Sequence, residues 1–204
     1  MNFLAHLYVS GDSPEIMVGN FIGDFVKGSD FSRFEPGIAT GIELHRAIDE
    51  YTDHHRMVKQ SKGRLRPKFR HYSGVIVDIF YDHFLAVNWR MYHGRPLKEF
   101  AGYVYGLVES RRNVLPDKVK YMLPYMTSGN WLVNYGTLDG IHRSLSGLAR
   151  RTTYKSKMDE AVIELKRYYD EFKSEFSSFL PDLKKYSEDW ISRKIRPASD
   201  GPDQ

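Results

Sequence analysis

The sequence of 204 residues contains no cysteine. A disulfide framework, a thiolate nucleophile and a metal site built on sulfur are therefore excluded. Long apolar runs are also missing. The most apolar stretch, residues 74–87, carries Asp78, Asp82 and His83, so it is too short and too charged to span a bilayer. The N-terminus has neither the basic start nor the apolar run of a signal peptide. We therefore expect a cytoplasmic protein with no membrane partner.

Several catalytic motifs are absent as well. The chain has no GxxxxGK[ST] phosphate-binding loop, no GxGxxG, no HExxH and no GxSxG. These absences argue against P-loop and dinucleotide-binding proteins, against zinc proteases of the HExxH type and against hydrolases with a serine nucleophile elbow.

The residues that are present predict helices. Apolar residues make up 41% of the chain, enough for the core of one domain. They recur at helical spacing, without convincing period-two alternation. Ser13 followed by Pro14 is a typical helix start, and Pro181 is expected to break the last long helix. The sequence thus predicts an all-α, single-domain bundle over residues 1–195 and a flexible tail over 196–204.

Carboxylates and histidines occupy positions where such helices should be apolar. Asp78 and Asp82 lie four residues apart on the most apolar helix, and His45 and Asp49 lie four apart on another. Asp24 lies on the apolar side of a third helix. An unpaired carboxylate costs several kcal/mol to bury, and a divalent cation removes this cost. Oxygen-rich ligands with some nitrogen and no sulfur favour Mn²⁺ or Mg²⁺, although other divalent cations fit too.

A simpler interpretation exists for each of these residues taken alone. A single histidine or aspartate on an apolar face is more often a core residue with its hydrogen bonds satisfied, and His45 could simply bond Asp49. His6 can be a ligand, a supporting residue or a core residue. The same anomaly on three helices nevertheless favours a metal centre.

The charge of the chain is unevenly distributed. Residues 56–70 contain seven basic residues and no acidic one. Such a run attracts a phosphate, a nucleic acid or an acidic protein, or it is simply a solvated loop. Only Phe69 and Tyr72 lie nearby as aromatic residues, so the signal for nucleic-acid binding is weak and we expect no nucleic-acid partner. The basic residues of this run are Arg56, Lys59, Lys62, Arg64, Arg66, Lys68 and Arg70.

Three stretches resemble one protein family. MNFLAHLYVSGDSPEIMVGNFIGDFVKG at 1–28, GIELHRAIDEYTDHH at 41–55 and GVIVDIFYDHFLAVNW at 74–89 are similar to the bacterial acyl carrier protein phosphodiesterases, and 130–151 matches more loosely. The resemblance implies an Mn²⁺-dependent enzyme. Its reaction would hydrolyse the phosphodiester between 4′-phosphopantetheine and a serine of acyl carrier protein, giving the apo-protein and free 4′-phosphopantetheine.

The resemblance also implies site residues. The family is thought to be a rearranged relative of the all-helical HD-type phosphohydrolases, whose motif contains an adjacent His-Asp pair. In this chain the adjacent pair is reversed, as Asp82-His83. The roles implied are metal ligation by Asp24, His45, Asp82 and His83, a catalytic role for Asp49 and Asp78, which would orient ligands or the attacking water or act as general base, and a candidate catalytic role for His6.

Acyl carrier proteins are acidic, so the resemblance gives the basic run a role as their docking surface, with Arg64, Arg66 and Arg70 as the favoured contacts. Two other functions stay open. One is an HD-like phosphohydrolase that acts on a nucleotide or another small phosphoester. The other is a non-catalytic protein that binds an acidic partner through the basic run.

Overall fold

The computed structural model describes residues 1–195, and the predicted tail at 196–204 lies outside the described residues. Within the described part the chain forms helices and no strands, so the predicted all-α class is confirmed. The helices are α1 (Phe3–Tyr8), α2 (Pro14–Ile22), α3 (Pro36–His54), α4 (Arg56–Phe69), α5 (Ser73–Val87), α6 (Trp89–Tyr92), α7 (Leu97–Ser110), α8 (Asp117–Ser128), α9 (Trp131–Asn134), α10 (Leu138–Ala149), α11 (Ala161–Arg167) and α12 (Tyr169–Ile195).

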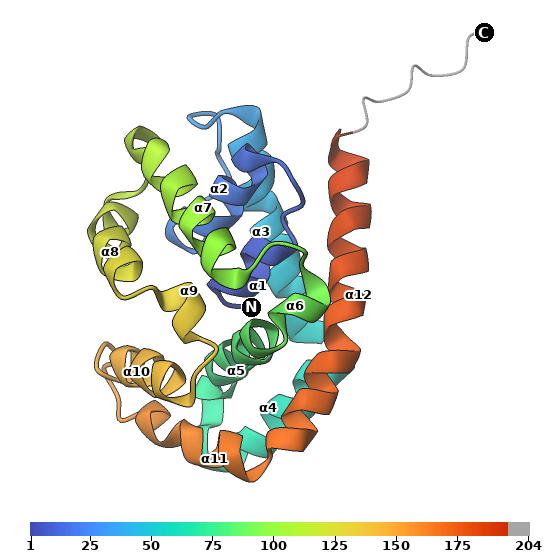
Figure 1. Ribbon diagram of the computed structural model, residues 1–204, viewed down its shortest axis with the longest axis vertical. Coiled ribbons are helices and arrows are strands. Elements are labelled where there is room, and N and C mark those ends of the chain that lie inside the picture. The colour runs from blue at the N-terminus through green and yellow to red at the C-terminus, as the bar shows by residue number, and fades with distance from the viewer. Residues whose placement is uncertain (196–204) are drawn as a thin grey trace, which may run out of the picture.

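Helix α5 lies at the centre of the arrangement. It contacts α1, α4, α10 and α12, and α12 runs along one side of the molecule, while α7 to α10 lie on the other (Figure 1). Phe80, Tyr81 and Phe84 of α5 are fully buried, and Phe172 and Phe176 of α12 pack against them. Burial of a large apolar side chain stabilises the fold by ~1.5–3 kcal/mol, so this aromatic contact is a major part of the core.

Helix α12 continues through Pro181, so the prediction of a break there is wrong. An interior proline removes one backbone hydrogen bond and costs ~3 kcal/mol. The residues around it, Phe179, Leu180 and Leu183, are at most 1% exposed. Their burial, at ~1.5–3 kcal/mol each, exceeds that cost and keeps the helix continuous.

The basic run at 56–70 is also helical. Residues Arg56–Phe69 form α4, whose Val58, Leu65 and Phe69 face the core. The alternative of a solvated loop is therefore wrong, because one face of the run is apolar at helical spacing.

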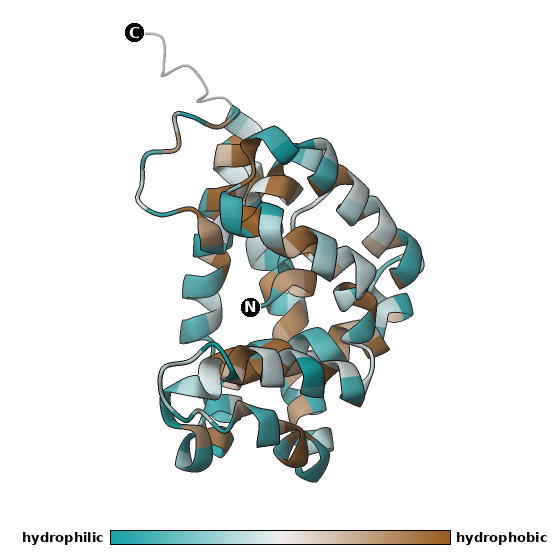
Figure 2. Ribbon diagram, turned by 90° about the vertical axis from the view of Figure 1, so that its left-hand side faces the viewer, coloured by the Kyte–Doolittle hydropathy of each residue, from teal (hydrophilic) through white to brown (hydrophobic). Residues whose placement is uncertain are grey.

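The N-terminal segment lies inside the molecule rather than at its edge. Met1 is 9% exposed, and Figures 1 and 2 both place the N-terminus among the helices; in Figure 2 it lies close to segments coloured as hydrophobic. Helix α1 follows directly, and its Leu4, Ala5 and Leu7 are buried. His6, between Ala5 and Leu7, is brought into the interior with them.

Helices α2 and α3 are in close backbone contact because glycines face each other. A Cβ atom on Gly19 would overlap the carbonyl oxygen of Ile38, and one on Gly41 would overlap that of Ile16. Ser13 accepts a hydrogen bond from the backbone N–H of Ile16, so the predicted start of α2 is confirmed. The close approach is what brings polar groups of α2 within hydrogen-bond distance of α3. In residues 1–195, no helix has both the length and the apolar character needed to cross a bilayer.

Candidate metal centre

Two buried histidines from distant parts of the chain meet face to face. The rings of His6 on α1 and His45 on α3 are stacked, with centroids 3.9 Å apart and planes within 12°. Gly23 makes room for them, because a Cβ atom at that position would overlap the His45 ring. Both side chains are at most 6% exposed, so their polar nitrogen atoms need partners inside the protein.

Asn20 of α2 provides partners for one nitrogen of each ring. Its side-chain oxygen lies 2.8 Å from His6 Nδ1, and its backbone oxygen lies 2.8 Å from His45 Nδ1. Its own amide nitrogen donates to the carbonyl oxygen of His6 and to Ser10 Oγ. Since both acceptors bind an N–H at Nδ1, each neutral imidazole carries its lone pair at Nε2.

Sequence reasoning missed Asn20. The signal available in the sequence was a polar residue within the apolar run GNFIG. In the structure this residue is fully buried.

The Nε2 atoms point toward carboxylates. His6 Nε2 lies 3.2 Å from Asp49 Oδ1, and His45 Nε2 lies 3.3 Å from Asp49 Oδ2 and 3.1 Å from Asp24 Oδ1. Asp49 comes from α3, one turn after His45, and Asp24 from the 3₁₀ turn Gly23–Phe25 that follows α2. The side chains of Asp24 and Asp49 are 64% and 39% exposed. The site is therefore buried on the histidine side and open on the carboxylate side.

The carboxylates determine the charge of the site. Burial alone would lower the pKa of His45, but the hydrogen bonds with Asp24 and Asp49 outweigh it and raise that pKa to about 9. Burial and the nearby His45 lower the pKa of His6 to about 4. Burial opposes ionisation of Asp49, yet its contacts with His45 and His6 and the positive charge of the Met1 amino group hold its pKa well below the usual range. The carboxylates thus hold a cation, the imidazolium of His45, between them.

A second cation lies beside Asp49. The α-amino group of Met1 is 3.0 Å from Asp49 Oδ1 and 3.5 Å from Asp78 Oδ1. Burial would lower the pKa of this amino group, but Asp78 and Asp49 raise it to about 10. Burial raises the pKa of the Asp78 carboxyl. Asp78 is therefore close to the centre and shares a cation with Asp49.

The donor set suits a divalent metal. His6, His45 and Asp49 each offer a ligand atom, and these atoms lie within 4.8 Å of one another. Asp24 adds an oxygen next to His45. Imidazole nitrogens whose other N–H is held by the protein, combined with carboxylates, form a common site for divalent cations. The residues present thus fit the metal that the sequence predicts.

Asp82, on α5, lies away from this centre, and its side chain contacts the N-terminus of α1. Its carboxylate accepts hydrogen bonds from the backbone N–H groups of Leu4 and Ala5, at 2.8 and 3.0 Å. It is fully buried, and burial raises its pKa to about 7 despite these bonds. The structure therefore does not bring Asp82 together with the histidines. It gives Asp82 the contacts of a satisfied core residue that holds α1 in place.

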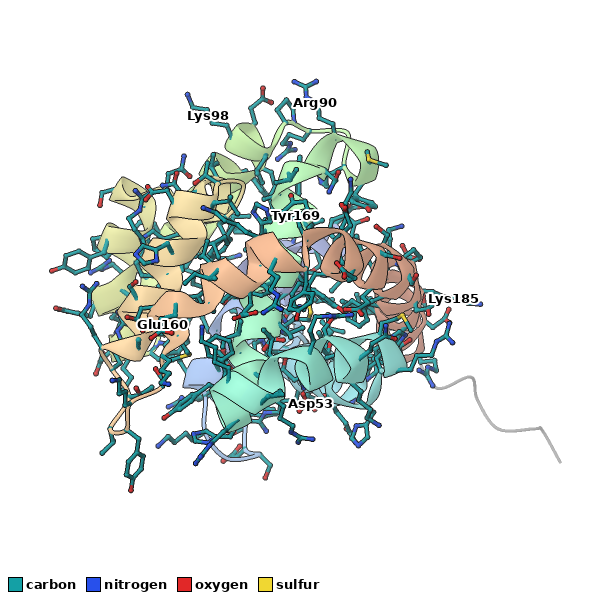
Figure 3. The ribbon with its side chains drawn as sticks, turned by 90° about the horizontal axis from the view of Figure 1, so that it is seen from below. Asp53, Arg90, Lys98, Glu160, Tyr169 and Lys185 are labelled. Atoms are coloured by element: carbon teal, nitrogen blue, oxygen red, sulfur yellow. The ribbon has the colours of Figure 1, made fainter. Side chains whose placement is uncertain are left out.

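His83 is separated from the centre as well. Its Nδ1 lies 2.8 Å from the carbonyl oxygen of Tyr135, and its Nε2 lies 3.2 Å from the hydroxyl of Tyr169, which is labelled in Figure 3. Burial lowers the pKa of His83, which favours the neutral ring. His83 follows Asp82 by about 100° around the helix, so the two residues face different partners.

A cavity of about 890 Å³ adjoins the centre. Asp24, Asp49 and Asp78 contribute to its wall, so the carboxylates border an open space large enough for a substrate. Its lining also includes apolar and aromatic side chains, namely Phe3, Phe25, Val75, Ile79, Met122, Trp131 and Leu148, and the basic side chains Arg143, Arg150 and Arg151.

The basic residues of the run 56–70 are partly neutralised within the protein. Arg64 forms two hydrogen bonds with the buried Glu175, at 2.8 and 2.9 Å. Lys62 pairs with Asp53, and Lys68 pairs with Glu160 and Glu164. Asp53 and Glu160 are labelled in Figure 3. Arg56, Lys59, Arg66 and Arg70 are exposed. None of the seven residues lines the cavity, so their docking role stays a prediction.

Fold and site together define the class: an all-α protein with a candidate divalent-metal centre of histidines and carboxylates beside a cavity. Residues 1–183 match the family described as Acyl carrier protein phosphodiesterase. The chain belongs to this family, so the resemblance seen in the sequence is confirmed.

Curated relatives carry the same name, "Acyl carrier protein phosphodiesterase". The protein from Enterobacter sp. (strain 638) is 32% identical over 184 residues, which cover 90% of this chain and 95% of the relative. The protein from Photorhabdus laumondii is 29% identical over 92% of this chain and 96% of the relative. The protein from Escherichia coli (strain K12 / DH10B) is 32% identical over 90% and 95%, respectively. No solved structure matches the chain, so the expected relation to HD-type folds stays a prediction.

Proposed function

We propose that this chain hydrolyses the phosphodiester that joins 4′-phosphopantetheine to a serine of acyl carrier protein, giving the apo-protein and free 4′-phosphopantetheine. The observation that carries the proposal is the convergence of His6, His45 and Asp49 on one point beside the cavity. Membership of the phosphodiesterase family over residues 1–183 supports the reaction class and the partner.

The metal in this proposal is Mn²⁺, with Mg²⁺ or another divalent cation as a substitute. His6 and His45 would hold it through Nε2, and Asp49 and Asp24 through carboxylate oxygens. A cation bound there lowers the pKa of a coordinated water and polarises a phosphoryl oxygen. Asp82 and His83 stand outside this ligand set, because their polar atoms bond α1, Tyr135 and Tyr169 instead.

The protein's own residues prepare the attack. Asn20 accepts from both Nδ1 atoms and keeps each Nε2 free for ligation. Asp78 borders the cavity beside Asp49, where its carboxylate can orient a water molecule and take its proton. The oxygen of that water ends on phosphorus, the bond from phosphorus to the serine oxygen breaks, and the serine oxygen takes up a proton to leave as the hydroxyl of the apo-protein.

The cavity suits the phosphopantetheine arm. Its volume, about 890 Å³, accommodates a ligand of drug size, and its aromatic and aliphatic wall matches an arm that is largely aliphatic apart from its amides. In this arrangement the arm lies against residues such as Trp131 and Met122, while the phosphodiester lies at the carboxylates.

Intact-protein mass spectrometry of a holo-acyl carrier protein tests the proposal. Incubation with this protein and Mn²⁺ should remove one 4′-phosphopantetheine mass, and EDTA should prevent the loss. His45→Ala should abolish the reaction, whereas the exposed His71→Ala should not alter it. An unchanged holo mass across several carrier proteins would contradict the proposal and direct attention to nucleotides and other small phosphoesters. The expected cytoplasmic location stays a prediction.

A further inference from the structure

A second basic segment borders the cavity. Residues 140–158, which form most of α10 and the loop after it, contain no aspartate or glutamate. Helix α10 lies on the side of the molecule opposite α12 (Figure 1). The basic residues of the segment, apart from His142, are Arg143, Arg150, Arg151, Lys155 and Lys157, and all five are exposed.

The charges of this segment are mostly free of partners inside the protein. Arg143 pairs with Asp139 one turn earlier on α10. Among residues 1–195, no carboxylate lies within ion-pair distance of Arg150, Arg151, Lys155 or Lys157. In the run 56–70, by contrast, three of the seven basic residues are paired internally. Within residues 1–195, each stretch thus leaves four basic residues without an internal ion pair, but these are four of five in 140–158 and four of seven in 56–70, so the segment 140–158 is less neutralised by the protein itself.

The segment is also continuous with the proposed reaction site. Arg143, Arg150 and Arg151 line the same cavity as Asp24 and Asp49, whereas no residue of α4 does. A macromolecule that inserts a substituent into this cavity must place its own surface against the cavity rim. Complementary charge at that rim raises the association rate and fixes orientation. Arginine adds bidentate pairing with carboxylates.

We propose that Arg150 and Arg151, extended by Lys155 and Lys157, form the docking surface for an acidic face of the carrier protein. The inference rests on the proposed function and adds to it the surface on which the partner sits while its arm enters the cavity. Tyr154, in the middle of this basic group, is 74% exposed and offers an aromatic contact within the same surface.

Charge reversal on the two basic surfaces tests the inference. One variant is Arg150→Glu/Arg151→Glu, and the matched control is Arg56→Glu/Arg66→Glu on α4, which makes the same change in net charge at two exposed arginines. The measurement is the Kd for apo-acyl carrier protein, which lacks the arm and so reports docking alone. It is repeated at low and at high salt.

We expect the Arg150→Glu/Arg151→Glu variant to bind about tenfold more weakly or worse, and the α4 variant to stay within about threefold of the unaltered protein. The Kd of the unaltered protein should rise steeply with salt. Arg150→Lys/Arg151→Lys should restore most of the affinity. Bound Mn²⁺ should be unchanged in every variant, which shows that the fold and the centre are intact.

With holo-acyl carrier protein, the reversal should raise KM and leave kcat close to its original value, since the proposed role of these groups is docking and not the reaction. Equal losses of affinity in both variants, or a loss in the α4 variant alone, would overturn the inference. So would a loss that the lysine variant does not restore. If the unaltered protein removes the arm while the reversal leaves binding intact, only the docking surface is refuted. If the unaltered protein neither binds nor processes a carrier protein, the proposed function fails and the docking surface with it.

Discussion

Replacing Asp82 by alanine separates a structural role from metal ligation. The substitution removes the acceptor of two backbone N–H groups, those of Leu4 and Ala5, at a fully buried position. A buried donor left without a partner costs ~1–3 kcal/mol, so the expected loss of stability is roughly 2–6 kcal/mol. Asparagine keeps one acceptor oxygen and should lose about half as much.

The loss should depend on pH. The pKa of Asp82 is about 7 in the folded protein and 3.8 in an exposed reference state, because burial disfavours the carboxylate. Between pH 3.8 and about 7, folding is therefore accompanied by the uptake of a proton at Asp82. The stabilisation that this protonation provides is fully present below pH 3.8 and is lost as the pH rises to about 7. The difference in the free energy of unfolding between the unaltered protein and Asp82→Ala should accordingly be larger at pH 5 than at pH 8.

Urea denaturation followed by circular dichroism at both pH values measures these differences. The exposed Asp189→Ala is the matched control and should change the free energy of unfolding by less than about 0.5 kcal/mol. Unchanged stability of Asp82→Ala at pH 5, together with loss of bound metal, would refute the reasoning and restore Asp82 as a ligand.

Three further predictions concern the site and its support. Asn20→Ala should weaken Mn²⁺ binding in calorimetry by ~10–100-fold, because His6 loses the side-chain oxygen that orients its ring, while His45 keeps the backbone oxygen of residue 20; unchanged affinity would contradict this. Gly147→Trp should fill the cavity and lower kcat/KM for the holo-carrier protein on the order of tenfold. The control Gly102→Trp, on the exposed side of α7, should leave kcat/KM unchanged. Equal kcat/KM values for the two variants would place the arm elsewhere. Gly41→Ala should destabilise the fold by ~1–3 kcal/mol in thermal unfolding, because its Cβ would overlap the backbone of α2; an unchanged Tm would refute that close contact.

Local patterns in the sequence predicted much of the helical fold. Ser13 and Pro14 mark the start of α2 because the capping interaction is confined to one helical turn. Pro181 misled the prediction for the opposite reason. Its effect depends on how tightly the residues around it pack against other helices, and local periodicity carries no information about that packing.

The same distinction applies to the site. His45 and Asp49 are four residues apart on one helix, so their proximity follows from helical geometry. Asp78 and Asp82 have the same spacing but diverge in function, because α1 packs beside α5 and places its free N–H groups at Asp82. The meeting of His6 with His45 depends on tertiary structure, since the two residues lie 39 positions apart in the sequence.

The central claim is that His6 and His45 bind one divalent cation together. Pulsed electron paramagnetic resonance of the protein with one equivalent of Mn²⁺ tests it directly, because coordinated imidazoles produce ¹⁴N couplings. We expect couplings from two imidazoles, reduced to one in His6→Ala and in His45→Ala and unchanged in His83→Ala. Binding without nitrogen coupling, or a coupling lost in His83→Ala and retained in His6→Ala and His45→Ala, would contradict the account.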